Sequence, residues 1–304
     1  MKKISVVIPV HNEEKNIPIV YKETKEVLES MRKEKNYSYE IIFVNDGSTD
    51  NSLEILKKLK KKDPYLRVLN MDRQRGQASA LTAGFFYAKG DIIVSMDGDG
   101  QNDPIYIKDL VETLKKGYKV VTGYRQKRKV PFLTRVLPSK IANWLISLVT
   151  GVKVHDNGCS LKAYVSEVPK RLQIPHGFHR FLPAFFGVKN EEVCEIKVID
   201  RPRLYGKSHY NLKRVFEVLR DLISIFFILR NPQKYEKIFL FLFIFFLISN
   251  SILLLYTLIT PSYWVFIVDF LFFLFTGSCF IIWKNLKRFN KAQVEGVFKV
   301  EEIL

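Results

Sequence analysis

Short apolar runs alternate with amphipathic stretches over the first two-thirds of the chain. The runs are rich in Ile and Val and end at turn or polar residues, which is typical of buried strands. They are Ile4–Val10, Glu40–Asp46, Leu66–Asp72, Asp91–Asp97 and Tyr118–Tyr124. Between them, apolar residues at helical spacing predict helices over Ile17–Arg32, Ser52–Lys62 and Gln77–Ala88. This alternation predicts an α/β fold in which a largely parallel sheet is covered on both faces.

Two long apolar stretches change the picture near the C-terminus. Residues 238–259 and 263–283 each approach the ~20 apolar residues that cross a bilayer as a helix. Lys and Arg precede the first stretch and follow the second, so the positive-inside rule places both ends in the cytoplasm. These features predict a multi-pass protein of the inner (cytoplasmic) membrane. A pair of buried helices in a soluble protein is the alternative.

The patterns divide the chain into four parts. We expect a catalytic domain over 1–211, an amphipathic interfacial helix over 212–235, a transmembrane hairpin over 236–284 and a cytoplasmic tail over 285–304. The end of the tail alternates apolar and polar residues, which favours an edge strand added to a neighbouring subunit. We therefore expect a homo-oligomer.

The net charge of the chain limits the kinds of partner that it is expected to bind. A formal net charge of +17 implies an anionic partner, such as an acidic membrane surface, a phosphorylated substrate or nucleic acid. The three cysteines are far apart and show no C-x-x-C spacing, so neither a disulfide framework nor a zinc site is indicated.

An acidic loop follows the fourth apolar run. Asp97, Asp99 and Asp103 stand close together, although neighbouring carboxylates disfavour one another's ionisation unless a cation lies among them. A calcium loop counted from Asp97 would need Gly and Glu where Asn102 and Lys108 stand. Mg²⁺ or Mn²⁺ instead binds through one or two carboxylates and completes its shell with substrate phosphates. The loop therefore favours one of these two ions.

Several motifs in order carry a resemblance to a known family. They are VVIPVHNEE, VNDGSTD, RGQASALTAG, MDGDGQNDP, TGYR, DNGCSLKAY and RPRLYGKSHYNL. Together, over about residues 4–232, the chain resembles the family 2 glycosyltransferases, and within them the polyprenyl-phosphate glycosyltransferases, similar to dolichyl-phosphate mannose synthases and bacterial undecaprenyl-phosphate sugar transferases. The resemblance implies a GT-A catalytic domain (Rossmann-like, with a mostly parallel sheet), interfacial helices and a two-helix transmembrane hairpin.

The resemblance also implies site residues. For the nucleotide sugar these are Pro9, His11, Glu13, Asp46, Asp97, Arg203, Lys207 and Ser208. For the metal they are Asp97, Asp99 and Gln101, which match D-x-D-x-Q. For the acceptor phosphate they are Arg125, Arg135 and Ser139, and the catalytic residues are Asp99, Arg125 and Arg135. His11 stands where the family usually has Tyr or Phe, and His209 replaces the usual Lys of R-x-x-G-x-S-K, so Lys207 is expected to supply that charge.

The implied reaction is an inverting, metal-dependent transfer from a nucleotide sugar to a polyprenyl phosphate at the cytoplasmic membrane face. A lipid phosphate is already an anion, so it needs guanidiniums to hold it more than a general base. The loop DGDGQNDP resembles bacterial relatives that use UDP-linked uronic acids or aminosugars, which favours UDP over GDP. The product would be a lipid-linked sugar for the cell envelope. The surplus of Lys and Arg is expected to meet anionic lipids, and no nucleic acid partner is expected.

Three other functions are weighed against this reading. The first is a membrane glycosyltransferase that is processive or uses another acceptor. A processive polysaccharide synthase shares the GT-A core, but the chain lacks its Q-x-x-R-W motif and two spans are few for a translocating channel. A glycosidase would hold its carboxylates apart, around a sugar ring. A basic membrane scaffold or nucleic-acid binder would account for the charge but leaves the acidic loop unexplained.

Overall fold

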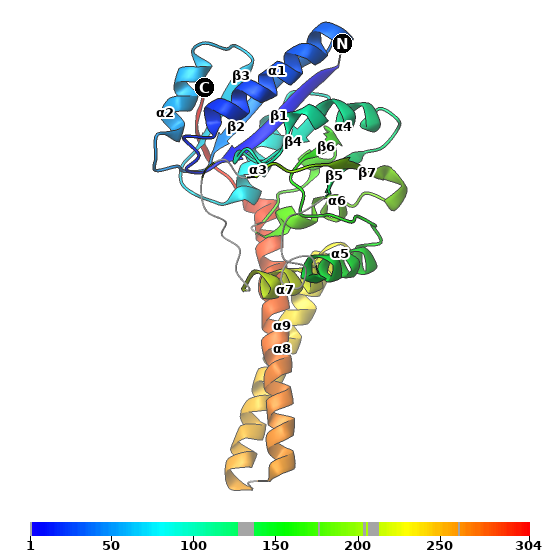
Figure 1. The fold of residues 1–304 in the computed structure, drawn as a ribbon. Coiled ribbons are helices and arrows are strands. Elements are labelled where there is room, and N and C mark those ends of the chain that lie inside the picture. The colour runs from blue at the N-terminus through cyan, green and yellow to red at the C-terminus, as the bar shows by residue number, and fades with distance from the viewer. Residues whose placement is uncertain (1, 127–136, 176, 203–204, 206–212, 261) are drawn as a thin grey trace. The chain divides into compact units, whose positions relative to one another are not determined.

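The structure is a computed structural model that describes residues 2–126, 137–175, 177–202, 205, 213–260 and 262–304 (Figure 1). For 137–142, 180 and 213–220 it describes the backbone alone. The chain forms two compact units. The first comprises residues 1–212 and 296–304, and the second comprises Lys213–Glu295.

Strands of the first unit form a single mixed sheet in the described part of the chain, with the order β7-β5-β6-β4-β1-β2-β3-β8. The strands are β1 (Lys3–Val10), β2 (Ser38–Asn45), β3 (Leu66–Met71), β4 (Ile92–Ser95), β5 (Val120–Arg125), β6 (Lys162–Val165), β7 (Val193–Val198) and β8 (Val300–Ile303). Neighbours β4-β1-β2-β3 and β5-β7 are parallel, whereas β6 and β8 run antiparallel to the strands beside them. The predicted mostly parallel sheet is confirmed.

Helices cover both faces of this sheet. The longer helices of the unit are α1 (Ile17–Lys35), α2 (Ser52–Lys60), α3 (Gln77–Tyr87), α4 (Ile107–Leu114) and α5 (Leu137–Thr150). Shorter ones are η1 (Pro104–Tyr106), η3 (Pro169–Arg171), η4 (Phe178–Phe181), α6 (Leu182–Phe185) and η5 (Asn190–Glu192).

Alternation along β1 separates the two faces. Its even-numbered apolar residues, such as Val6 and Ile8, share one buried cluster with α1, α2 and α4. Val7 points the other way, towards α3, where a Cβ on Gly84 would lie 2.2 Å from Val7 Cγ1. Only glycine permits this close approach of α3 to the sheet. The covered parallel strands therefore have apolar residues on both sides, as the sequence pattern predicted.

The C-terminal strand differs from its prediction. Its alternating pattern forms the predicted edge strand, but β8 pairs with β3 of the same chain, with Ile303 opposite Leu69. Val68 and Leu304 exchange backbone hydrogen bonds of 3.0 and 2.9 Å, and the Phe298 ring packs against Phe86. The exposed edge of β3 offered unpaired backbone groups that the tail itself satisfies. The predicted homo-oligomer stays a prediction, without this strand as its basis.

Deleting residues 297–304 is expected to destabilise the first unit by on the order of 3 kcal/mol, because β3 loses backbone partners that include both Val68 bonds and the 3.2 Å bond from Asp72 N to Lys299 O. It is also expected to promote aggregation through the newly open edge. Thermal unfolding and light scattering measure the two effects. A matched control is Lys57→Ala, which removes side-chain ion pairs, including the 3.5 Å pair with Glu302 of β8, but leaves the backbone hydrogen bonds between β3 and β8 in place. This variant should change stability little. An unchanged melting temperature after deletion would contradict a stabilising role for β8.

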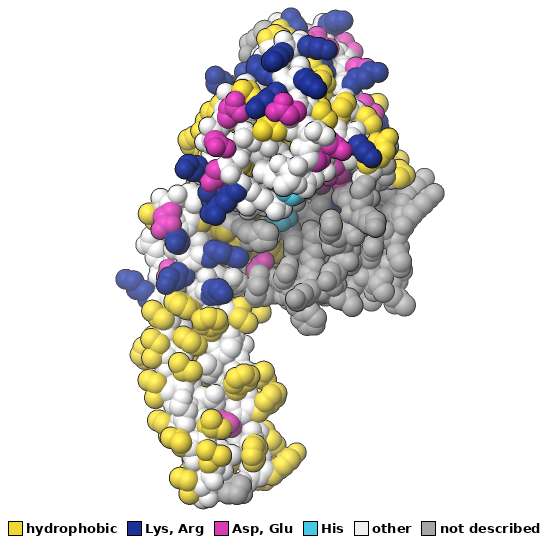
Figure 2. Space-filling view, turned by 90° about the vertical axis from the view of Figure 1, so that its left-hand side faces the viewer, with side chains coloured by type: hydrophobic (Ala, Val, Ile, Leu, Met, Phe, Trp, Pro, Cys, Tyr) yellow, Lys and Arg dark blue, Asp and Glu magenta, His cyan; other side chains and the backbone are white. Residues whose placement is uncertain are grey.

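The second unit consists of α7 (Lys213–Ile228), α8 (Pro232–Ile259) and α9 (Tyr263–Glu295). The helices α8 and α9 pack along each other, and each is long and apolar enough to cross a membrane. Their most apolar windows are 0% and 11% buried, so the alternative of a buried soluble helix pair does not fit. Figure 2 shows hydrophobic side chains over most of this hairpin, with Lys and Arg gathered towards one end.

Polar side chains fasten the helices of this unit near its charged end. Asn285 on α9 donates from Nδ2 to Ser224 Oγ on α7 at 2.9 Å, and both residues are buried. Asn290 on α9 donates in the same way to Glu236 on α8 at 2.6 Å. The buried bond between Asn285 and Ser224 helps to fix the register of α7 and α9, because unpaired polar groups would be costly there.

Candidate active site

A cavity of about 190 Å³ lies at the carboxyl ends of β1, β2 and β4. It is lined by Pro9, Val10, His11, Glu13, Asp46, Gln77, Asp97, Gly98 and Asp99. Parallel strands end at the same edge of a sheet, and ligands of open α/β sheets bind beyond that edge. The structure thus brings together all the predicted nucleotide and metal residues that it describes except Gln101, which does not line the cavity. Their roles stay predictions.

On the β2 side of the cavity, Asp46 organises the loop that precedes α3. Its two carboxylate oxygens accept hydrogen bonds from Arg75 N at 2.7 Å and Gly76 N at 2.8 Å. Gly76 has φ +89°, a conformation that glycine adopts without strain. The Asp46 backbone carbonyl lies 2.8 Å from His11 Nδ1. Because a carbonyl only accepts, the ring donates from Nδ1, which leaves Nε2 as an acceptor in the neutral imidazole.

On the β4 side, Asp97 and Asp99 form a pair of carboxylates. Burial and the negative charge of Asp99 raise the pKa of Asp97 to about 6. Gln77 at the start of α3 donates from Nε2 to Asp97 Oδ1 at 2.8 Å, and the Gln101 backbone N–H donates to Asp99 Oδ1 at 3.1 Å. Gln77 was not predicted as a site residue, although it belongs to the quoted motif RGQASALTAG.

The carboxylates of the cavity fit a divalent cation whose coordination shell is completed by a bound ligand. Among the described residues, no group of three His, Cys, Asp or Glu side chains could hold a metal ion by itself. Asp97 and Asp99 supply two carboxylates, which is the number that Mg²⁺ typically takes from a protein when substrate phosphates supply further oxygens. The pKa of Asp97 is raised by burial and, secondly, by the negative charge of Asp99, and a nearby cation would favour the charged form of both groups.

The third carboxylate of the acidic loop has a different partner. Asp103 accepts a hydrogen bond from Ile105 N at the start of η1, and its Oδ2 lies 2.7 Å from Nη2 of Arg201. The sequence spacing grouped Asp103 with the other two acids, but it does not line the cavity.

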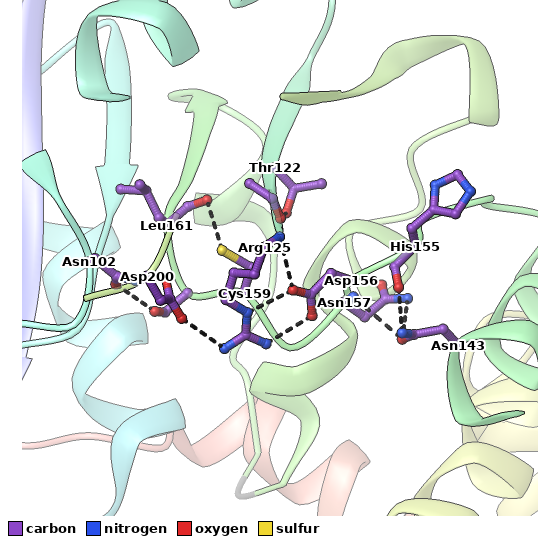
Figure 3. Close-up of polar contacts among 12 residues, drawn as sticks. Asn102, Thr122, Arg125, Asn143, His155, Asp156, Asn157, Cys159, Leu161 and Asp200 are labelled. Carbon is purple, nitrogen blue, oxygen red and sulfur yellow. Dashed lines mark hydrogen bonds and ion pairs between the residues drawn. The ribbon is translucent and has the colours of Figure 1, made fainter. Parts of the chain in front are cut away.

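Arg125 is held by two acidic side chains (Figure 3). Its Nε and Nη2 donate to the two oxygens of Asp156 at 2.6 and 2.8 Å, and Nη1 lies 3.5 Å from Asp200 Oδ2. Asp156 is 4% exposed, so this is a buried bidentate pair. Sequence reasoning missed both acids, although Asp156 opens the quoted motif DNGCSLKAY. Of these three guanidinium nitrogens, Nη1 makes the longest contact with a protein partner.

The remaining predicted site residues lie beyond what the structure describes. Arg135, Arg203, Lys207 and Ser208 fall outside the described residues, and the side chain of Ser139 is not described. Their predicted roles therefore rest on the sequence motifs.

Gly98 sets the distance between the acidic loop and β1. A Cβ at this position would lie 2.5 Å from Val10 Cγ1 and 3.0 Å from Pro9 O. Both neighbours belong to the buried end of β1, so Gly98→Ala is expected to push the loop outwards and to lower any catalytic rate at this site roughly tenfold or more, because misplaced reacting groups are costly. Stability should fall by about 1–3 kcal/mol.

Steady-state rates and thermal unfolding test this expectation together. Gly277→Ala in α9 is the matched control, since no atom lies within 4 Å of its added Cβ. Wild-type rates in Gly98→Ala would show that the loop does not need this close approach.

The comparisons with known proteins agree with the fold. The family model Glycosyl transferase family 2 matches residues 5–172. The chain therefore belongs to glycosyl transferase family 2, and it is an enzyme of the glycosyltransferase class. This confirms the family, the fold class and the enzyme class that the motifs predicted.

Two curated relatives share substantial identity with the chain. Dodecaprenyl-phosphate galacturonate synthase of Rhizobium johnstonii is 35% identical over 236 residues, which are 76% of this chain and 69% of that protein. Undecaprenyl-phosphate 4-deoxy-4-formamido-L-arabinose transferase of Photorhabdus laumondii is 35% identical over 225 residues, covering 74% and 68%.

Solved structures share the fold at low identity. Glucosyl-3-phosphoglycerate synthase of Mycobacterium tuberculosis, solved with Mn²⁺ and UDP-glucose, is 19% identical with a TM-score of 0.53, covering 75% of this chain and 79% of that one. Mannosyl-3-phosphoglycerate synthase of Rubrobacter xylanophilus is 12% identical with a TM-score of 0.57, covering 73% of each chain.

Proposed function

We propose that this enzyme transfers a sugar from a nucleotide sugar, with UDP favoured over GDP, to a polyprenyl phosphate. The observation that carries the proposal is the carboxylate pair of half-buried Asp97 and buried Asp99 in a cavity at the carboxyl ends of parallel strands. The two curated relatives support it, because both are named for sugar transfer or synthesis on a prenyl phosphate. The sugar is proposed to be a uronic acid or an aminosugar, the two classes that those names contain.

The donor is proposed to bind with Mg²⁺ or Mn²⁺. Asp97 and Asp99, with Gln101 next to them in the loop, would hold the ion, which would stabilise the negative charge that develops on the leaving diphosphate. Pro9, His11, Glu13 and Asp46 line the same cavity and would hold the nucleoside. Arg203, Lys207 and Ser208 are proposed to bind the nucleotide sugar as well.

The acceptor phosphate is the proposed nucleophile. It is an anion at neutral pH, so this chain needs to orient it and does not need to remove a proton from it. Arg125 would keep its bidentate contact with Asp156 and offer Nη1, while Arg135 and Ser139 would complete the phosphate site. Attack in line with the leaving group in one step would invert the anomeric centre.

The hairpin of α8 and α9 is proposed to anchor the enzyme in the cytoplasmic membrane, with the catalytic domain in the cytoplasm. Lysines at the start of α8 and at the end of the apolar part of α9 would meet anionic lipid headgroups, at about 1 kcal/mol each near the surface. They are Lys234, Lys237, Lys284, Lys287 and Lys291. The isoprenoid chain of the acceptor would then stay in the bilayer.

Product analysis by mass spectrometry tests the proposal. Detergent-purified protein is incubated with a polyprenyl phosphate, Mn²⁺ or Mg²⁺, and a panel of UDP- and GDP-linked sugars that includes uronic acids and aminosugars. A glycosylated polyprenyl phosphate from one donor is the expected result. Nucleotide binding without product from any donor would exclude the proposed acceptor.

A further inference from the structure

The acidic loop between β4 and η1 must hold two like charges side by side. Both carboxylates line the cavity. Asn102 supplies one restraint, since its Oδ1 accepts hydrogen bonds from Asp97 N at 2.9 Å and from Ser160 Oγ at 2.7 Å. This fixes the start of the loop against the turn that precedes β6. The far end of the loop needs a restraint of its own.

Arg201, which follows β7, supplies contacts at that far end. Its backbone N–H donates to the carbonyl of Gln101 at 2.8 Å. Its guanidinium contacts Asp103 Oδ2 through Nε at 3.1 Å and Nη2 at 2.7 Å, and donates from Nη1 to Glu23 Oε2 on α1 at 2.8 Å. One side chain thus joins the loop to α1, and its backbone joins the loop to the end of β7.

The residue before Arg201 continues the same connection. Asp200 Oδ1 lies 3.4 Å from Nδ2 of Asn102, and its Oδ2 lies 3.5 Å from Arg125 Nη1 (Figure 3). The segment Asp200–Arg201 therefore touches the loop at three consecutive positions, Gln101, Asn102 and Asp103. Arg201 itself does not line the cavity.

We propose that Arg201 is the positioning residue of the metal-binding loop, holding Asp97 and Asp99 in register for a divalent cation by clamping Gln101 and Asp103. A guanidinium suits this task, because its rigid planar fork reaches two carboxylates at once. Partners that orient metal ligands typically change metal affinity 10–100-fold when they are removed. The inference rests on the metal site of the proposed function.

Mn²⁺ binding measured by electron paramagnetic resonance in the presence of UDP tests the inference without any transfer reaction. Arg201→Met is expected to weaken Mn²⁺ binding roughly tenfold or more. Arg32→Met is the matched control, since Arg32 also pairs with a carboxylate on α1, Glu29 at 3.4 Å, but lies away from the loop. Affinities within twofold of wild type for both variants would overturn the inference.

A double-variant cycle separates positioning from general stability. Asp103→Asn is expected to weaken Mn²⁺ binding as Arg201→Met does, and the two changes together should weaken it little more than either alone. Fully additive losses would show that the two residues act independently and would overturn the clamp. If Arg201→Met fails to fold, Arg201→Lys takes its place. A lysine keeps the charge but cannot contact Asp103 and Glu23 as a fork, so weakened Mn²⁺ binding is again expected and wild-type affinity would overturn the inference.

The outcome for the unaltered protein distinguishes this inference from the proposed function. Mn²⁺ binding without a polyprenyl product leaves the clamp standing and removes the proposed acceptor. Absence of Mn²⁺ binding in the presence of UDP overturns both.

Discussion

Asp99→Ala is expected to lower the rate of sugar transfer roughly a thousandfold or more. Asp99 is 6% exposed and lines the cavity together with Asp97. Loss of one of two carboxylates would leave a divalent cation with a single acidic ligand from the protein, and the charge developing on the leaving diphosphate would lose its stabilisation. Initial rates of lipid-linked product, measured by mass spectrometry, give the size of the effect.

Removing the metal from the wild-type protein is expected to lower the rate of sugar transfer as Asp99→Ala does. EDTA should reduce the wild-type rate to that of Asp99→Ala, and Mn²⁺ added in excess should restore activity only to the wild type. Asp109→Asn on α4 is the control, because it removes a carboxylate that does not line the cavity. A variant at Asp99 that kept more than about a tenth of the wild-type rate would speak against a metal-bound diphosphate.

Arg125→Met is expected to destabilise the protein by about 3–5 kcal/mol, because it leaves Asp156 buried without its counter-charge. Both oxygens of that carboxylate are bound by the guanidinium. Thermal unfolding in detergent measures the loss. The double variant Arg125→Met/Asp156→Leu should recover most of the stability, since replacing both members of a buried pair by apolar groups costs little.

The double variant also tests the proposed role of Arg125 towards the acceptor. If Nη1 holds the acceptor phosphate, the KM for polyprenyl phosphate should rise while nucleotide binding stays unchanged. A stable double variant with a wild-type acceptor KM would restrict Arg125 to its structural pair with Asp156.

Much of the fold could be predicted from periodicity alone. The first four helical and strand signals, from Ile4 to Ser52, begin within two residues of β1, α1, β2 and α2, because covered parallel strands need nearly continuous Ile and Val and surface helices need an apolar stripe. The short strands β6 and β7 were missed. Their pattern is weak, and β6 depends on antiparallel pairing with β4 and β5, which lie far from it in the sequence.

The candidate site, like the fold, could be predicted from the sequence only in part. The sequence by itself determined the family, the acidic pair Asp97 and Asp99, and the cluster at the strand ends, because motifs and strand boundaries are local properties of the chain. Only the tertiary structure decided that Asp103 faces Arg201, that Arg125 is paired with Asp156, and that the C-terminal strand returns to β3 of its own chain. These pairs join residues that are far apart in the sequence. Each charged or hydrogen-bonding group has several possible partners in the chain, and only folding brings one of them within hydrogen-bonding distance.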